Sequence, residues 1–347
     1  MARYIKKWKR HIIPLFGSII VIYSLFFVST RTPLTHTTTY VNDIENSCVI
    51  ERLEQQLFAA KNEEQIISLL MQHMLFSREF LNIQYTDQGA YQEISKALFS
   101  MCKDPIALEI YEESKQQFDD LSHIKNDLLL AFSKLIRYYP NIKVPPIYTI
   151  ITGMQQDLYV SKNLIVIGLD CFLGKNPKFS LHNIPKYSAD TYNTDSIVCK
   201  IMLLYIQQFN AVNKNDKTLL AEMLYYGKNF FLIKDILPDL PEHVILGYTS
   251  DQLKDLNRYK TVVWEHFIEN ELFFNTNHVI KKQYIYPRPF TGEISSNCPG
   301  SIGKWLGWEI VKEYMKRNKK IETINGLMSC TDNQKLFHNS SYRPKDE

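Results

Sequence analysis

The chain has 347 residues, of which 45% are hydrophobic and 13% aromatic, so it can bury a full core and is not a disordered protein. Five of its 40 Lys and Arg residues lie within the first ten positions, which leaves 35 positive charges against 37 negative charges in the rest. A slightly acidic body lacks the clustered basic stripe that releases counterions from phosphates, and this excludes nucleic acid as a partner.

The N-terminus combines a basic tail, residues 1–11, with an uncharged apolar run, residues 12–28. The run has the length of a short transmembrane helix, which needs ~17 to 25 residues. Because basic flanks stay in the cytoplasm, the sequence predicts a membrane anchor that sends the rest of the chain into the periplasm. A cleavable signal peptide is the competing interpretation, but no small-residue cleavage site follows Val28. Lipid attachment is not indicated either, since Cys48 has no Leu three positions before it.

A Thr-rich segment, residues 29–47, predicts a stalk, and residues 48–347 follow it as one exported domain. The domain holds six widely spaced cysteines that form no C-x-x-C pair: Cys48, Cys102, Cys171, Cys199, Cys298 and Cys330. Six cysteines in an exported domain allow about 15 disulfide pairings, among which the sequence does not choose. Buried free thiols are the alternative, and both interpretations stay open.

Hydrophobic spacing changes along the exported domain. Apolar residues recur every three or four positions over residues 48–139, which predicts a set of amphipathic helices. Two runs rich in β-branched residues, 147–152 and 163–172, then predict neighbouring strands. Helical patterns resume over the segments 195–209, with Asp195 as N-cap, 217–234, 249–264, opened by a Thr249–Gln252 capping box, and 303–317. The predicted fold is mainly α (α+β), a helical body with a small central β-sheet.

No metal-binding motif is visible among the nine histidines. A zinc-binding H-E-x-x-H helix places two histidines one turn apart, and no pair here has that spacing. His73 lies in an apolar helical pattern and His266 follows Trp264–Glu265, so both are predicted to be packed or surface histidines. The sequence therefore predicts no metal and no cofactor.

A glycine-rich segment, PGSIGKW, resembles a phosphate-binding loop only superficially. The Walker pattern needs four residues between its glycines and Ser or Thr after the Lys, whereas two residues separate Gly300 from Gly303 and Trp305 follows the Lys. We interpret Gly300 as a turn residue. Gly303 and Gly307, one helical turn apart, are predicted to admit a close backbone neighbour, with Trp305 and Trp308 supplying contact area.

Three charged residues are the candidates for an unrecognised catalytic site. Asp170 ends the second predicted strand, while Glu222 and Lys228 belong to the helix 217–234. A single carboxylate without an identifiable partner more often caps a turn. Gly227 costs about 1 kcal/mol relative to Ala in a helix interior, so it has a packing role. Because no G-x-S-x-G motif and no Cys–His pair appears, nucleophilic catalysis has no support.

Several segments, in unchanged order, resemble the gliding motility lipoprotein GldB family. The most specific are the GLDCFLG strand end at 168–174, Gly227–Lys228, and PGSIGKWLGW at 299–308; the resemblance runs from about Cys48 to the C-terminus. It implies a cell-envelope protein of gliding bacteria, normally held by a lipid anchor and without an established enzymatic activity. The chain departs from the family in lacking a lipobox and in having Ser301 where Arg is usual and Tyr259–Lys260 where Asn-Glu is usual.

The same family is distantly similar to predicted zinc-dependent proteases. That similarity implies that the helix 195–209 stands where H-E-x-x-H belongs and that Tyr226 stands in place of the third ligand, so the scaffold is a degenerate zincin-like one without metal. The residues that the resemblance singles out for structure or interaction, rather than catalysis, are Asp170, Gly174, Gly227, Lys228, Trp264, Pro299, Gly300, Gly303, Trp305, Gly307 and Trp308.

Three hypotheses of function follow. The first is a non-catalytic, membrane-anchored envelope protein whose periplasmic body contacts other envelope or motility proteins. The second is a peptidase-like hydrolase that uses Asp170, Glu222 or Lys228. The third is a binder of a soluble ligand, held in a cleft between the helices and the sheet. The anchor, the missing catalytic motif and the family resemblance favour the first.

Overall fold

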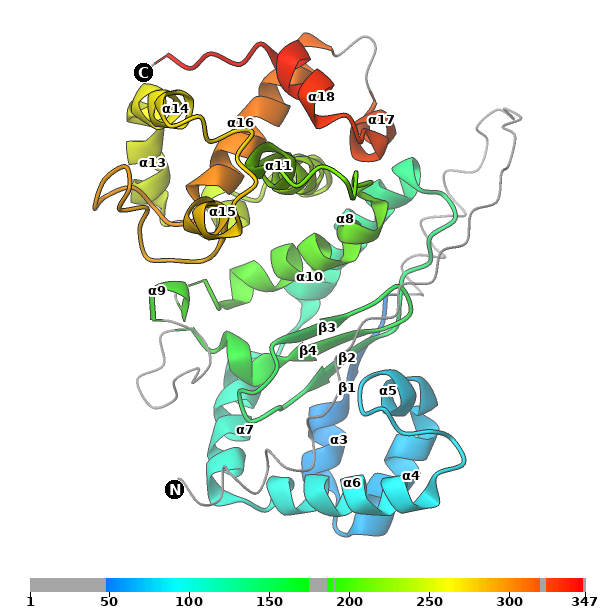
Figure 1. Ribbon diagram of the computed structural model, residues 1–347. Helices are drawn as coiled ribbons and strands as arrows, with labels where there is room; N and C mark the ends of the chain where they lie inside the picture. The colour runs from blue at the N-terminus through cyan, green and yellow to red at the C-terminus, as the bar shows by residue number, and fades with distance from the viewer. Residues whose placement is uncertain (1–47, 175–185, 190, 319–322, 346–347) are drawn as a thin grey trace. The chain divides into compact units, whose positions relative to one another are not determined.

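Helices surround a small mixed β-sheet on both of its faces (Figure 1). The computed structural model describes residues 48–174, 186–189, 191–318 and 323–345. The predicted cytoplasmic tail, anchor and stalk, residues 1–47, lie outside the described residues. Among the described helices, none combines the length and the apolar content that a membrane crossing needs.

The sheet has four strands in the described residues, in the order β1, β2, β4, β3. Their bounds are β1 (Ile50–Arg52), β2 (Ile147–Ile150), β3 (Leu158–Val160) and β4 (Ile165–Gly168). The two strands predicted from the sequence are present as β2 and β4, which pair in parallel with Ile147 opposite Ile165. Both are shorter than predicted, and Asp170 does not end a strand: it lies in the 3₁₀ turn Leu169–Phe172 that follows β4. The short edge strands were not predicted: β1 runs parallel to β2, and β3 runs antiparallel to β4.

Alternation along β2 and β4 divides the interior into two hydrophobic cores. All four residues of each strand are buried, as expected for a sheet covered on both faces. Ile147 and Ile165 point into the larger core. They share it with the helix that precedes β2 and with the helices that follow β4. Tyr148 and Val166 point into the smaller core, formed with the first helices of the domain. The sheet therefore joins two helical layers, as Figure 1 shows.

The helices before β2 occupy the region predicted to be helical from the sequence. They are α3 (Leu53–Ala59), α4 (Glu63–Gln72), α5 (Met74–Glu79), α6 (Gln88–Cys102), α7 (Pro105–Gln117) and α8 (Ser122–Tyr138). The side chains of Asn62, Asp87 and Asp104 cap α4, α6 and α7 by accepting backbone N–H groups of the first turn. Helices α3 to α6 pack on the smaller core, and α8 packs on the larger one.

The helices after β4 complete the larger core. They are α9 (Lys186–Ala189), α10 (Ile197–Tyr205), α11 (Leu219–Ile236), α12 (Glu242–Leu246), α13 (Ser250–Arg258), α14 (Lys260–Glu269), α15 (His278–Ile285), α16 (Ile302–Arg317), α17 (Ile324–Ser329) and α18 (Asn333–Ser340). Three short 3₁₀ turns connect them to the rest: η1 (Leu169–Phe172), η2 (Thr194–Ser196) and η3 (Ile206–Phe209). The mainly α (α+β) fold with a small central sheet is thus confirmed.

Two details of the predicted helices are wrong and one is confirmed. Asn193, and not Asp195, supplies the cap at the start of η2, where its side chain accepts the N–H of Ser196. The helix predicted over 249–264 is divided at Tyr259 into α13 and α14. The Thr249–Gln252 capping box is present in full, since each side chain accepts the other residue's backbone N–H.

All six cysteines lie in the described residues, and all six are free thiols. Five are buried, and Cys330 is half-buried. Burial raises the pKa of the Cys102 thiol to about 11 and that of the Cys199 thiol to about 12, which keeps both protonated and unreactive at neutral pH. Of the two interpretations that the sequence left open, the structure therefore shows free thiols, five of them buried.

Candidate functional site

Asp170 holds a tight turn at the carboxyl end of β2. Its carboxylate, 1% exposed, accepts the N–H of Met154 at 2.6 Å, the N–H of Thr152 at 3.1 Å and the Thr152 hydroxyl at 3.3 Å. The turn needs this support because Gly153 and Met154 both have positive φ angles, 66° and 60°. Burial raises the pKa of the Asp170 carboxyl, while the hydrogen bonds from the turn oppose that rise. Asp170 thus stabilises the turn at residues 152–154.

A second titratable cluster lies near Cys171, the residue after Asp170, and was not predicted from the sequence. The Lys200 ammonium sits 4.0 Å from the centroid of the Tyr192 ring. Burial lowers the pKa of Lys200, and burial together with the nearby Asp157 carboxylate raises the pKa of Tyr192. No sequence signal links these residues, because the loop before β3, the segment before η2 and α10 each supply one of them. Gly174, which ends this region, has a φ of +72° that favours glycine.

The tightest helix contact in the domain joins α11 to α16. A Cβ on Gly227 would overlap the carbonyl of Gly307, and a Cβ on Gly307 would overlap the carbonyl of Met223. The close backbone approach predicted for the glycines of α16 is therefore found, and its partner is α11. At Gly303, a Cβ would lie 3.0 Å from the Tyr284 carbonyl oxygen, which indicates a similar approach to the end of α15.

The two tryptophans of α16 fill the space around this contact. Trp305 is 1% exposed and Trp308 is fully buried. The Trp308 ring meets the Phe230 ring of α11 with centroids 5.6 Å apart, and the Lys312 ammonium lies 4.8 Å from the Trp308 ring. Trp264 of α14 is half-buried and packs on Tyr342 near the C-terminus, with centroids 5.3 Å apart. These residues stabilise the helical layer.

Pro299 and Gly300 close the loop that leads into α16. The Tyr248 hydroxyl donates to the Gly300 carbonyl at 2.9 Å, and the Thr291 hydroxyl donates to the Pro299 carbonyl at 2.7 Å. A Cβ on Gly300 would overlap the Arg288 carbonyl, so only glycine fits there. Gly300 thus lies in a turn that packs against the backbone of Arg288, next to the isolated bridge between Phe290 and Pro299.

Lys228 is a buried cation that ties two loops to α11. Its side chain, 2% exposed, donates to the Cys330 carbonyl at 2.8 Å and to the Ala211 carbonyl at 3.1 Å. Burial lowers the pKa of the Lys228 ammonium to about 8. The neighbouring Asn229 accepts a hydrogen bond from Asn210 at 2.8 Å, which adds a second polar link to the loop before α11.

We expect Lys228→Met to remove a pH-dependent contribution to stability. An ammonium whose pKa falls from 10.5 to about 8 on folding makes the native state less stable as the pH falls through that window. The unfolding free energy of the wild type, minus that of Lys228→Met, should therefore rise from pH 8 to pH 10 by on the order of 2 kcal/mol. Urea denaturation at pH 8, 9 and 10 measures this difference. Lys61→Met, at an exposed position, should show no such trend; a constant difference for Lys228→Met would refute the buried ammonium.

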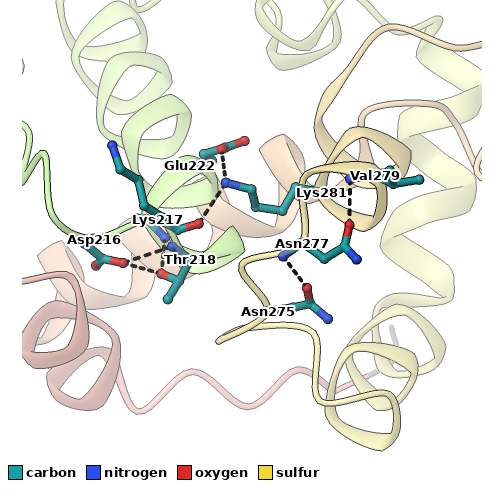
Figure 2. A network of polar contacts seen from close by, with 9 residues as sticks. Asp216, Lys217, Thr218, Glu222, Asn275, Asn277, Val279 and Lys281 are labelled. Atoms are coloured by element: carbon teal, nitrogen blue, oxygen red, sulfur yellow. Dashed lines mark hydrogen bonds and ion pairs between the residues drawn. The ribbon is translucent and has the colours of Figure 1, made fainter.

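Glu222 belongs to a polar network at the start of α11, which Figure 2 shows. The Lys281 ammonium of α15 donates to Glu222 at 2.6 Å and to the Lys217 carbonyl at 2.7 Å. Asp216 accepts the hydroxyl and the N–H of Thr218, the residue that caps α11 (Figure 2). The network fastens α15 to the first turn of α11.

The three residues considered for a hydrolase are thus not brought together. Asp170, Glu222 and Lys228 lie in separate networks, and no partner is shared between any two of them. In the part of the chain that the structure describes, no group of three or more His, Cys, Asp and Glu side chains could hold a metal ion.

One cleft in the described residues, about 590 Å³, lies between α5 and the segment that leads into β2. Three cations line it, Arg78, Lys143 and Lys162, and Pro145 and Pro146 form part of its wall. A second cleft of about 330 Å³ adjoins it and shares Leu75 and Arg78 with it. The sequence predicted a cleft between helices and sheet only in general terms and did not identify these residues.

Comparison with known proteins identifies one family. The family described as "Gliding motility protein GldB" matches residues 35–344, nearly the whole of the predicted exported domain. No curated protein and no solved structure matches the chain, so the zincin-like scaffold stays a prediction. Since the match covers far more than half of the sequence, the chain belongs to the gliding motility protein GldB family.

Proposed function

We propose that the chain is a non-catalytic cell-envelope protein that supports gliding motility, or associated envelope machinery, through protein–protein contacts. The observation that carries this proposal is the family match over residues 35–344. The matched residues include both hydrophobic cores and the contact between α11 and α16, so the match extends over nearly the whole exported domain.

The internal bonds of the charged residues support a non-catalytic role. A general acid or base must reach the proton that it transfers, within hydrogen-bond distance or through one water. Asp170 and Lys228 are 1% and 2% exposed, and each is directed to backbone groups of its own domain. Glu222 reaches solvent in part, but its carboxylate is engaged by Lys281. These side chains are used to hold turns and helices together.

The anchor in this proposal is the apolar run at residues 12–28, with the N-terminus in the cytoplasm and the body in the periplasm. The family name marks its members as lipoproteins. In this chain Cys48 is fully buried in the larger core, which leaves its thiol no space for an attached acyl chain. The burial of Cys48 therefore favours a transmembrane segment in place of the lipid anchor of the family.

Deletion of the gene from its host tests the proposal. We expect the deletion strain to stop gliding at the colony edge, and the full chain to restore movement. A chain in which an unrelated transmembrane helix of the same orientation replaces residues 12–28 should also restore it, whereas a chain with a cleavable signal peptide should not. A deletion strain that glides like its parent would contradict the proposed role.

A further inference from the structure

The cleft beside α5 carries positive charge that the described residues do not neutralise. Lys143 and Lys162 are exposed, and neither forms an ion pair with another described residue. The third cation of the cleft, Arg78, forms an ion pair with Glu79 at 3.1 Å, and Glu79 also accepts hydrogen bonds from Asn163 at 3.1 Å and from Ser161 at 3.2 Å. Of the three cations that line the cleft, Lys143 and Lys162 therefore keep a positive charge that no described carboxylate pairs with.

The two lysines converge because of the sheet topology. Lys143 precedes β2 and Lys162 precedes β4, and these strands run in parallel with Ile147 opposite Ile165. The amino ends of parallel strands lie at the same edge of a sheet, so both lysines reach that edge. The Tyr205 hydroxyl donates to the Lys143 carbonyl at 3.4 Å, which helps to fix the segment before β2. This bond joins the segment that carries Lys143 to the last residue of α10.

The adjoining cleft has the opposite character. Apart from Arg78, its lining is apolar or aromatic: Met74, Leu75, Ile83, Tyr85 and Tyr91. Met74 is 51% exposed and Tyr85 is 73% exposed, so this apolar lining is open to solvent. Because Leu75 and Arg78 line both clefts, the two form one continuous site with a cationic end and an apolar end. Such a site fits a molecule that is anionic at one end and apolar at the other.

The position of the site in the fold favours a lipid as that molecule. β1 runs parallel to β2 with Ile50 opposite Ile147, so the chain enters the sheet at the edge that carries the cationic cleft. Only the nineteen residues of the predicted stalk, 29–47, separate this domain from the predicted anchor, and a fully extended segment of that length spans at most about 65 Å. The cleft therefore stays within reach of the membrane surface that holds the anchor.

We propose that this site binds a single anionic phospholipid, with the phosphate at Arg78, Lys143 and Lys162 and the acyl end along Met74 and Tyr85. Arg and Lys are the side chains that proteins use to bind phosphate, Arg through its planar fork and Lys as a point charge. The proposal rests on the proposed function in one respect, since it requires the domain to stand beside a membrane. Lipid binding would orient the domain on the membrane for its protein contacts.

Native mass spectrometry of the full chain, released from a neutral detergent, tests the proposal by counting bound lipid. The probes are dihexanoyl phosphatidylglycerol, dihexanoyl phosphatidylcholine and glycerol phosphate. We expect one phosphatidylglycerol to bind, more tightly than phosphatidylcholine because of the charge and more tightly than glycerol phosphate because of the acyl chains. Equal affinity for the two lipids would overturn the cationic end of the site, and equal affinity for glycerol phosphate would overturn the apolar end.

Matched variants separate this site from the rest of the basic surface. Lys143→Gln with Lys162→Gln should weaken phosphatidylglycerol binding by about tenfold or more, since each cation near an anionic head group contributes substantially. Lys61→Gln with Lys335→Gln removes the same charge from exposed positions elsewhere and should leave binding unchanged. Met74→Gln should weaken lipid binding without affecting glycerol phosphate. Unchanged binding by the double variant of the cleft would refute the site.

The outcome is separable from that of the motility experiment. A chain that binds phosphatidylglycerol in the cleft, in a host that glides without the gene, would remove the motility role and leave the lipid site. A chain required for gliding that binds no phospholipid would remove the lipid site and leave the motility role.

Discussion

Asp170→Ala will destabilise the exported domain by about 4 kcal/mol, because each buried donor that loses its acceptor costs about 1–3 kcal/mol. The substitution removes the acceptor of the Met154 N–H, the Thr152 N–H and the Thr152 hydroxyl at once. It also releases a turn with two consecutive positive φ angles, Gly153 and Met154, which nothing else in the turn holds as closely. Urea denaturation at pH 7 measures the loss.

Two comparisons make the Asp170 result specific. Asp170→Asn retains one acceptor oxygen and should cost less than Asp170→Ala. Asp119→Ala removes an exposed carboxylate and should change the unfolding free energy by no more than about 0.5 kcal/mol. If Asp170→Ala proved as stable as Asp119→Ala, the carboxylate would have to serve some purpose other than holding the turn.

Gly307→Ala will also destabilise the domain, by about 3 kcal/mol, the upper part of the range for overpacking a tight core. The added Cβ would overlap the Met223 carbonyl, which is backbone and cannot turn aside as a side chain could. Alanine is favoured over glycine in a helix interior by about 1 kcal/mol, so the steric cost must exceed this gain. The expected loss therefore measures how closely α11 and α16 approach.

Gly89→Ala is the matched control for this contact. Gly89 also lies in a helix, α6, but its Cβ would meet only the Asp87 carboxylate oxygen, at 3.5 Å. We expect this substitution to raise the unfolding free energy slightly, through helix propensity alone. Thermal denaturation of the two variants beside the wild type should give opposite shifts of Tm. A stabilising Gly307→Ala would mean that the helices stand further apart than described.

The helices and the two buried strands could be predicted because their signals are local. Hydrophobic spacing marks α8 and α11, and the β-branched runs mark β2 and β4. β1 and β3 were missed because each has only three residues and forms through pairing with distant partners. The division of the 249–264 helix at Tyr259 was missed for a different reason: no Pro or Gly marks that position in the sequence.

The candidate site was less accessible to prediction than the fold. The glycines of α16 indicated a close neighbour, but only the structure identifies Gly227 on α11 as lying against Gly307. Lys143 and Lys162 converge only because β2 and β4 pair in parallel and in register, and no local pattern encodes that register. Helix packing between distant segments therefore determines the contact of α11 with α16, and strand pairing between distant segments determines the position of the basic cleft.

The most direct test of a non-catalytic role is the gliding of the deletion strain when it carries Glu222→Gln. Of the three residues considered for a hydrolase, Glu222 has the side chain that reaches solvent most, at 36% exposed. We predict gliding at the wild-type rate, because the glutamine keeps an oxygen for Lys281 and the helices stay joined. Loss of a general acid or base would lower turnover about a hundredfold or more. Gliding that stops while the protein remains in the envelope at its normal amount would contradict the account.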